Sequence, residues 1–521
     1  MRLRRGTLVD PSVAIAIAGA GLLVVQWAAA RPLWLDEELL AINLRDRGIP
    51  TYFEPLWLGQ FAPFGWLVLE RLVVIAFGTS ERALRCLPVL FGIATLATAV
   101  WIGRRWMTAA GAATLVILCA GSQWLTFYFL ELKSYSADAF FALLLPAVAA
   151  WSVDEITVAR PSHRPAIFWI MASIAQWFAN GALFVTPLCA LMLAAMLARR
   201  DGWRSALRFS CVGIVWLGSF ALNGMFVLRH AQASAYLQSF WAFAFPPPSA
   251  GAVGTLQWVG TQLAAFGGKP GSTRFGVLLW IAAIAGFFVH GRFAAGAMTR
   301  RTVALFYATV PLSAVLLATL RLVPFYERLT LWMLPALYVG VALLADAAWI
   351  VLHPKPVGAD PRVPPSLRYG EARQSAKRDG GRPGADTWVG PYGRPARAAA
   401  AIGLCVAIMI CADVVIRGVP AALVRARARH ENRGHDDRAA VRWLMSHKQP
   451  GDVWMTTHYG APAIWWYAGI DDHRIVEVSH QPDGSECRHD ELAAAVSDVP
   501  HVLLYLGFRF DDVPDGFDDL L

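Results

Sequence analysis

The sequence has few charged residues and few cysteines for its length. Of its 521 residues only 16% are charged, whereas 56% are hydrophobic, a composition that is rare in soluble proteins of this size. The seven cysteines are spread singly, with no Cys-x-x-Cys pair and no Cys/His pattern at metal-ligand spacing, which argues against a zinc module and a disulfide framework. This composition predicts an integral membrane protein.

The basic residues do not indicate a nucleic-acid-binding protein. The formal net charge is +9, but Lys and Arg occur in short clusters between apolar runs, which is typical of topology signals in membrane proteins. Nucleic acid is therefore excluded as a partner. The 22 Trp and 28 Phe suit a protein that contacts the bilayer, because aromatic rings favour the headgroup boundary.

Apolar runs long enough to cross a bilayer predict about eleven transmembrane helices. The first run follows a basic segment and has no clear cleavage site, so we interpret it as an uncleaved signal anchor. An Asn180-Gly181 step divides one long run and predicts a hairpin of two short spans. The predicted runs are 12–30, 84–102, 107–127, 137–152, 166–180, 181–198, 206–227, 274–292, 302–320, 329–351 and 397–418.

The apolar run 62–78 is left out of this set. Glu70 and Arg71 lie near its centre, so it predicts a helix along the membrane surface. With the N-terminus in the cytoplasm, the Lys/Arg clusters then fall in cytoplasmic loops, as the positive-inside rule requires. Counting 62–78 as a span would place those clusters outside. The segments predicted to face outward are 31–83, 128–136, 228–273, 321–328 and everything after about 419.

The C-terminal part predicts a linker and a small soluble module. The cytoplasmic segment 351–396 is rich in Pro, Gly and Arg and cannot bury a core. After the last transmembrane helix, residues 419–521 predict an extracytoplasmic α/β module with a helix at 436–446, a strand at Val453–Thr457 and two further helix and strand pairs. The predicted fold is an all-α polytopic membrane protein, with juxtamembrane helices outside and residues 1–350 forming the main transmembrane module.

Three consecutive carboxylates, Asp36, Glu37 and Glu38, follow the first predicted span. One interpretation is a wetted loop in which these residues cap a helix from Leu39 to Arg45, because acidic residues favour a helix N-terminus. The other interpretation is catalytic. Partial desolvation at the membrane surface tunes a carboxylate for base catalysis on a hydroxyl group.

The chain resembles a known family in this region. The string Leu35-Asp36-Glu37, the amphipathic stretch after it and Arg85-Cys-Leu-Pro resemble the N-terminal half of the C-type (GT-C) membrane glycosyltransferases. The group concerned, family 39, contains the protein O-mannosyltransferases and the bacterial lipid A aminoarabinose transferases. The resemblance covers roughly residues 12–200. It implies that Asp36 is the general base, that Glu37 orients Asp36 or the acceptor, and that Arg85 belongs to the substrate site.

Two further outward clusters fit this resemblance. The stretch from Glu131 through Lys133 and Tyr135 to Asp138 has the family's order of a basic, an aromatic or small, and an acidic residue, with Lys133 where arginine is usual. The alternative is that Lys133 pairs with Glu131 and Asp138. The second cluster is Arg321, Tyr326 and Arg328 in the short loop before the tenth span. It is suited to a lipid phosphate or to simple anchoring at the interface.

The resemblance implies an inverting hexosyl or pentosyl transfer from a polyprenyl-phosphate sugar donor to a hydroxyl of a glycan, lipid or protein acceptor, at a bacterial plasma (inner) membrane. The acidic residues are also compatible with a divalent cation, although no His/Asp pattern requires one. Two alternatives stay open. A lipid or sugar transporter or flippase would carry ionisable or helix-breaking residues at mid-membrane. In a non-catalytic scaffold, the three carboxylates would be dispensable.

Overall fold

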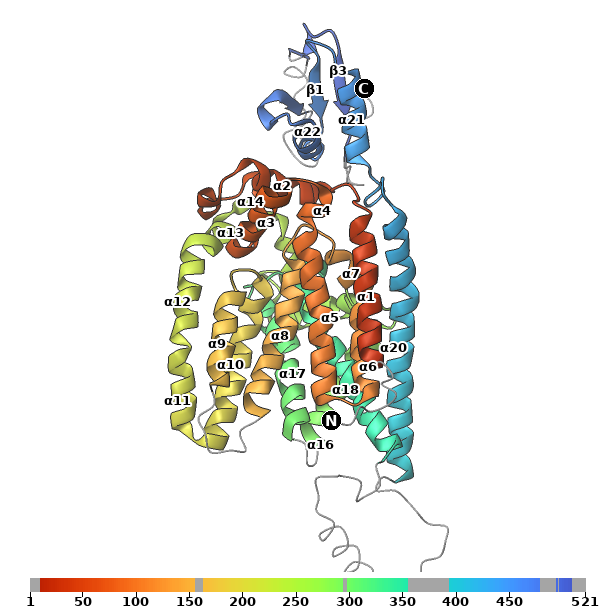
Figure 1. Cartoon of the computed structure of the whole chain (residues 1–521). Helices are drawn as coiled ribbons and strands as arrows, with labels where there is room; N and C mark the ends of the chain where they lie inside the picture. Colours follow the sequence, from red (N-terminus) through yellow and green to blue (C-terminus); the bar gives the residue numbers. More distant parts are fainter. Residues whose placement is uncertain are drawn as a thin grey trace, which may run out of the picture.

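A computed structural model describes residues 10–154, 163–293, 298–354, 393–477 and 493–507, position 495 excepted. Figure 1 shows a bundle of helices with a small α/β module at one end. The long helices of the bundle are α1 (Pro11–Ala28), α5 (Cys86–Trp106), α6 (Ala109–Gly121), α8 (Tyr135–Asp154), α9 (Arg164–Ala175), α10 (Asn180–Asp201), α11 (Trp203–Val212), α12 (Ile214–Asn223), α16 (Gly276–Phe293), α17 (Met298–Thr319), α18 (Leu334–Leu352) and α20 (Arg394–Arg427).

The helices agree with the predicted spans. Within the described ranges, eight helices are long and apolar enough to cross a membrane, and three shorter apolar helices occupy 109–121, 164–175 and 276–291. Together they account for each predicted run, including the hairpin at Asn180-Gly181, where α9 ends at Ala175 and α10 begins. Large apolar side chains such as Ile17, Leu191 and Ile408 point outward, as helices in contact with lipid require.

Small residues let the bundle helices approach closely. A Cβ atom added to Gly286 of α16 would lie 1.9 Å from the carbonyl oxygen of Gly340 in α18, a distance that no real side chain tolerates. Gly103 of α5 meets Ala112 of α6 in the same way, at 2.7 Å. Close backbone packing of this kind replaces the hydrophobic driving force that lipid cannot supply between helices.

Short helices gather at the end of the bundle that carries the module, where Figure 1 shows α2, α3, α13 and α14 together. The run 62–78, predicted as a surface helix, contains α3 (Phe64–Phe77). The other short elements are α2 (Leu35–Asp46), the 3₁₀ helices η1 (Ile49–Phe53), η2 (Trp57–Gly59), η4 (Ala242–Ala244) and η5 (Glu327–Met333), the π-helix η3 (Gly224–Leu228), α4 (Glu81–Leu84), α7 (Gln123–Tyr128), α13 (Arg229–Ala233) and α14 (Ala235–Phe240). The remaining helix, α15 (Gly251–Gly268), has 18 residues.

The C-terminal module has the predicted α/β character. Its elements are α21 (Asp437–His447), β1 (Val453–Thr456), α22 (Ala461–Ala468), the 3₁₀ helix η6 (Asp472–Arg474), β2 (Ile475–Glu477) and β3 (Val502–Tyr505). The strands are parallel in the order β2-β1-β3. Trp454, Ile464 and Leu503 belong to its own small core. Residues 478–492, between β2 and β3, lie outside the described residues, as does most of the predicted linker 351–396.

Two helices are longer than the predicted ranges. The last transmembrane span was predicted at 397–418, and α20, which contains this range, has 34 residues and is therefore about 51 Å long, more than the roughly 30 Å of hydrocarbon. It runs the length of the bundle and leads directly to the module (Figure 1). The helix expected from Leu39 begins at Leu35, so the three carboxylates lie inside its first turn rather than before it. There they favourably face the positive end of the helix dipole.

Candidate active site

Asp36 faces a cation from a distant loop. Its carboxylate lies 2.8 Å from Nη1 of Arg328, and both side chains are about one-fifth exposed. Asp36 comes from the first turn of α2 and Arg328 from η5. The Arg328 guanidinium also lies 5.8 Å from the ring centre of Trp34 and 5.6 Å from that of Trp241. The predicted base and one predicted phosphate ligand are thus adjacent, beside two indole rings.

One hydrogen-bond donor of the Arg328 guanidinium has no partner among the described residues. Among the residues that the structure describes, its buried Nε has no hydrogen-bond partner. A buried donor without a partner is costly. Arg328 therefore offers hydrogen-bonding capacity to an anion that approaches Asp36 from the same side.

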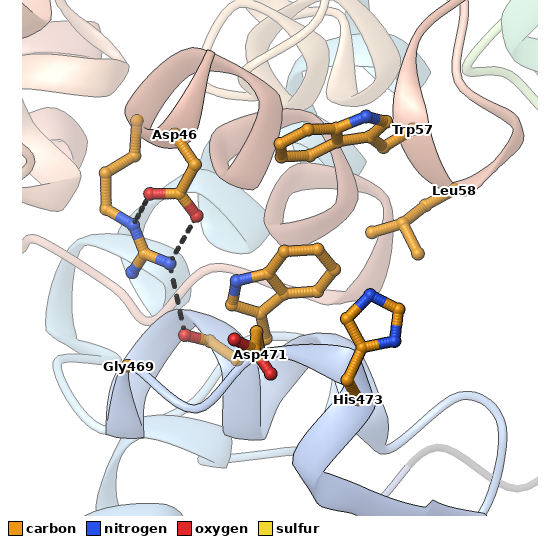
Figure 2. Close-up of a pocket in the computed structure, with 8 residues that line it drawn as sticks. Asp46, Trp57, Leu58, Gly469, Asp471 and His473 are labelled. Carbon is orange, nitrogen blue, oxygen red and sulfur yellow. Dashed lines mark hydrogen bonds and ion pairs between the residues drawn. The ribbon is translucent and has the colours of Figure 1, made fainter.

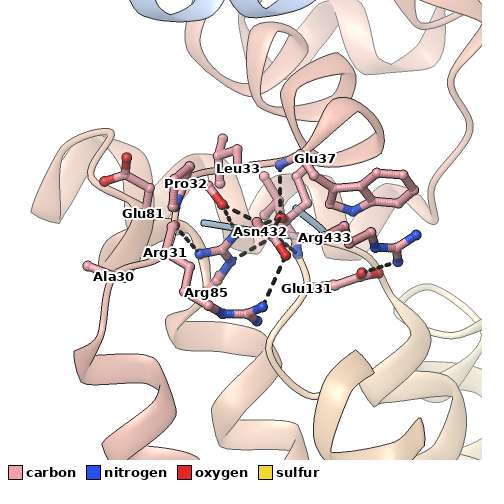
Figure 3. A network of polar contacts seen from close by, with 12 residues as sticks. Ala30, Arg31, Pro32, Leu33, Glu37, Glu81, Arg85, Glu131, Asn432 and Arg433 are labelled. Carbon is pink, nitrogen blue, oxygen red and sulfur yellow. Dashed lines mark hydrogen bonds and ion pairs between the residues drawn. The ribbon is translucent and has the colours of Figure 1, made fainter. Parts of the chain in front are cut away.

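Glu37 is fully buried and anchors the first turn of α2, which also carries Asp36 (Figure 3). Its two carboxylate oxygens accept from Nε and Nη2 of Arg85 at 2.8 and 2.5 Å. They also accept from the amide of Leu132 at 2.9 Å and from the Asn432 side chain at 3.3 Å. Arg85 donates in addition to the carbonyl oxygens of Arg31 and Pro32. Since both side chains are saturated, these contacts favour positioning roles for Glu37 and for Arg85, which the sequence had assigned to the substrate site.

Glu131 pairs with a residue from the far end of the chain. Its carboxylate lies 2.7 Å from Nη2 of Arg433, whose guanidinium stacks 3.4 Å from the ring centre of Trp34. Burial raises the pKa of Glu131 to about 7, although the charge of Arg433 opposes this shift. The segment before the C-terminal module therefore forms one wall of the site.

The other residues of the second cluster have separate partners. Nζ of Lys133 donates to the side chain of Gln60 at 2.6 Å. Burial lowers the pKa of Lys133, and the negative charge of Asp36 opposes this shift more than any other charge does. Lys133 therefore interacts electrostatically with Asp36. Asp138 accepts from the amide of Gly181 at 2.8 Å and caps α10. The alternative, in which Lys133 pairs with Glu131 and Asp138, is therefore not the observed arrangement.

The rings of Tyr135 and Tyr326 lie near the ion pair of Asp36 and Arg328. The ring of Tyr135 packs edge-on against Tyr128, with centroids 5.1 Å apart. Tyr326 packs edge-on against Phe243 at 4.9 Å and lies 6.0 Å from Trp241. The two tyrosines thus belong to an aromatic environment, the second of them shared with the loop 228–273.

Arg321 lies at the end of α17 in a conformation that favours glycine. Its φ is 57°, and the amides of Arg321 and Leu322 close a Schellman motif on the carbonyls of Ala318 and Leu317. An L-residue in this conformation costs roughly 1–2 kcal/mol. The Arg321 side chain donates to the carbonyl of Pro246, so its hydrogen bond goes to the loop 228–273, and Arg328 alone forms the ion pair with Asp36.

The described residues do not provide a metal site. Nowhere in these ranges do three His, Cys, Asp or Glu side chains come together as ligands. Asp36, Glu37 and Glu131 each face an arginine instead. This set of donors does not fit a divalent cation, and no step of the chemistry below is derived through one.

Two carboxyl groups, those of Glu38 in α2 and Asp437 in α21, interact where the bundle meets the C-terminal module. Glu38 is completely buried, and burial raises its pKa well above the ordinary value, with further contributions from the charges of Asp437 and Glu37. Burial likewise raises the pKa of Asp437, whose carboxylate accepts from the hydroxyl of Tyr505 at 2.7 Å. Nearby, the amide of Leu33 donates to the hydroxyl of Tyr467 at 2.8 Å. Proton uptake by Glu38 therefore favours docking of the module.

The contribution of Glu38 to stability is expected to be lost as the pH rises. It is fully present below the ordinary pKa near 4.5 and falls by about 1.4 kcal/mol per pH unit until the raised pKa is passed. Glu38→Gln should remove this slope, measured as the apparent melting temperature of the detergent-solubilised chain at several pH values. The control is Glu54→Gln, whose side chain is 70% exposed. Equal slopes in both variants would contradict the assignment.

With this geometry in place, the chain can be compared with known proteins. No protein-family model matches it, and no curated protein does. The crystal structure of ArnT from Cupriavidus metallidurans bound to undecaprenyl phosphate matches with a TM-score of 0.50 at 13% identity, over 92% of this chain and 90% of that one. The chain therefore shares the overall fold of this ArnT structure. The apo form of the same ArnT gives 0.46 at 14% identity, over 89% of each chain.

A larger protein shows a weaker likeness to the chain. The apo oligosaccharyltransferase of Archaeoglobus fulgidus matches with a TM-score of 0.46 at 12% identity, over 89% of this chain but only 64% of that one. At these identities the likeness concerns the fold, and the chemistry must be argued from the side chains of this chain.

Several residues at the site escaped sequence reasoning. Asn432 lies 395 positions from its partner Glu37, and Arg433 lies 302 positions from its partner Glu131. Trp34 precedes the acidic triplet, and no role was predicted for it. The available signal was the arginine in Asn432-Arg433-Gly434, a turn-forming string just after the last span, with φ of 57° at Arg433.

Proposed function

We propose that this chain is a membrane glycosyltransferase that moves a hexosyl or pentosyl group from a polyprenyl-phosphate carrier to an acceptor hydroxyl, with inversion. The observation that carries the proposal is the contact of Asp36 with Arg328 at 2.8 Å. It joins a carboxylate suited to act as a general base with a cation suited to bind a phosphate, the two groups that such a transfer needs. The ArnT structure is bound to undecaprenyl phosphate, which supports a carrier of this class.

The transfer is a displacement at the anomeric carbon of the sugar. The acceptor oxygen forms a bond to this carbon while the bond from the carbon to the phosphate oxygen breaks, and the polyprenyl phosphate leaves with the electron pair. Asp36 takes the proton of the attacking hydroxyl. The donor phosphate competes with Asp36 for Arg328, so that binding of the donor frees the carboxylate, and the guanidinium then stabilises the charge that develops on the leaving phosphate.

The other residues have supporting roles in this scheme. Glu37 and Arg85 hold the first turn of α2, and Lys133 adds positive charge beside Asp36. Arg321 and Tyr326 border the lipid phosphate at the loop before α18. The segments predicted to face outward meet here, since Gln60, Glu131, Arg328 and Arg433 all contribute. This meeting supports an extracytoplasmic site in a bacterial plasma membrane, with the N-terminus in the cytoplasm.

The purified chain should release free polyprenyl phosphate from a radiolabelled polyprenyl-phosphate sugar. Vectorial movement of the intact lipid across a vesicle membrane, without cleavage, would instead indicate a flippase. If neither cleavage nor movement occurs, the scaffold interpretation holds. These outcomes distinguish the three classes directly.

Arg328→Ala should weaken donor binding more than acceptor binding. Losing a hydrogen bond to a charged group costs about 1.5–3 kcal/mol, which corresponds to a roughly 10- to 150-fold higher KM for the donor. Arg328→Lys should recover part of this loss because it keeps the charge without the planar fork. The measurement is the KM for each substrate, with Arg200→Ala, at the C-terminus of α10, as control. An unchanged donor KM would contradict the role of Arg328.

A further inference from the structure

A cavity lies between the bundle and the C-terminal module, apart from the site around Asp36. It has a volume of about 960 Å³ and is bordered by the end of α2, by η2 and by the residues around α22 and η6. This volume is within the range of small-molecule sites, about 300–1,000 Å³. Figure 2 shows Trp57 and Leu58 on one wall and Asp471 and His473 on the other.

The walls of this cavity are fixed by Arg45. Its guanidinium donates to the carbonyl oxygens of Trp466 at 2.9 Å and Trp465 at 3.2 Å, both in the last turns of α22. It also forms a two-pronged ion pair with Asp46 and lies 4.8 Å from the ring centre of Trp466. Arg45 therefore clamps the module to α2, so the cavity is built by both parts of the chain.

The lining combines indole surface with free polar groups. The rings of Trp57 and Trp465 stack at 24° with centroids 5.8 Å apart, and Trp57 is 42% exposed. Asp471 and His473 are exposed, and no partner is seen for either side chain within the described ranges. Flat aromatic surface accepts the C–H face of a sugar ring, while a carboxylate and an imidazole bind its hydroxyls. A purely apolar ligand would leave these polar groups unused.

We propose that this cavity binds a saccharide and that the acceptor of the enzyme is a glycan chain. The second part rests on the proposed function. Asp36 and Arg45 are nine positions apart on α2, a rise of about 14 Å. A short oligosaccharide spans this length, so its inner sugars would lie on Trp57 while the hydroxyl at its end reaches Asp36. The module then selects the acceptor through residues that it places on the cavity.

The test is binding of saccharides to the full chain in a detergent without a sugar headgroup, since a glycosidic detergent would compete. The probes are tri- and tetrasaccharides of neutral hexoses and of N-acetylhexosamines, detected by saturation-transfer NMR. Trp57→Ala and Asp471→Ala should each weaken binding about tenfold or more, as expected when a central contact of a site is removed. Trp443→Ala, an exposed tryptophan on α21, should bind as the wild type does.

Three results would overturn the inference: no probe saccharide binds the wild type, Trp57→Ala binds as tightly as Trp443→Ala, or a peptide binds in place of the saccharides. Binding is measured without donor lipid, so it is independent of turnover. If saccharides bind but donor lipid is never cleaved, the proposed transferase function fails while the saccharide site stands. Cleavage without saccharide binding removes both the saccharide site and the glycan acceptor but leaves the proposed transferase function.

Discussion

Replacing Asp36 by asparagine is expected to lower turnover by about 10²- to 10⁴-fold, the usual contribution of a general base. Asparagine has nearly the same shape but cannot take the proton of the acceptor hydroxyl. Donor binding should be kept or strengthened, because Arg328 loses the carboxylate that competes with the phosphate. The measurement is the rate of polyprenyl-phosphate release together with the donor affinity.

The matched control for this variant is Asp201→Asn. Asp201 also pairs with an arginine, since its carboxylate lies 2.5 Å from Nη2 of Arg200. This pair lies at the end of α10 that is predicted to face the cytoplasm. The Asp201→Asn variant should therefore release polyprenyl phosphate at the wild-type rate. The role of Asp36 as base would be refuted by near-normal turnover of Asp36→Asn, whatever the family likeness.

Arg85→Ala is expected to destabilise the chain by about 3–5 kcal/mol, because it leaves the carboxylate of Glu37 buried without its cation. Glu37 is 0% exposed, and Arg85 supplies two of its hydrogen bonds. The double variant Glu37→Gln/Arg85→Gln should be less destabilised than the single one, since no unpaired charge remains. Thermal unfolding followed by tryptophan fluorescence gives both values.

The same variant separates two roles for Arg85. A positioning residue lowers stability and turnover together and leaves the donor KM of the remaining folded protein nearly unchanged. A substrate ligand, as the sequence implied, would raise the donor KM with little loss of stability. The second pattern would restore the original assignment and contradict the structural interpretation.

The bundle was predictable because each span is marked locally. A run of about twenty apolar residues identifies a span, and a break such as Asn180-Gly181 identifies a hairpin, without information on contacts between distant residues. The start of α2 was misplaced because the acidic triplet was expected to precede the helix, whereas carboxylates are equally favourable inside its first turn. The length of α20 was underestimated because the apolar criterion ends where the helix leaves the hydrocarbon and continues to Arg427.

The site was only partly predictable. Asp36 and Arg328 were each predicted as site residues, but their contact joins positions almost 300 residues apart, and spacing does not determine it. The saturation of Glu37 by Arg85, Leu132 and Asn432 depends on three segments that meet only in the folded chain. The cavity at Trp57 was missed for the same reason, since its other wall belongs to the C-terminal module.

A structure of the chain with bound polyprenyl phosphate tests the central claim most directly. We predict that the phosphate lies within hydrogen-bond distance of Arg328, with its ion pair to Asp36 opened and the carboxylate facing the space beyond the phosphate. A phosphate bound elsewhere while the Asp36–Arg328 pair stays closed would contradict the account.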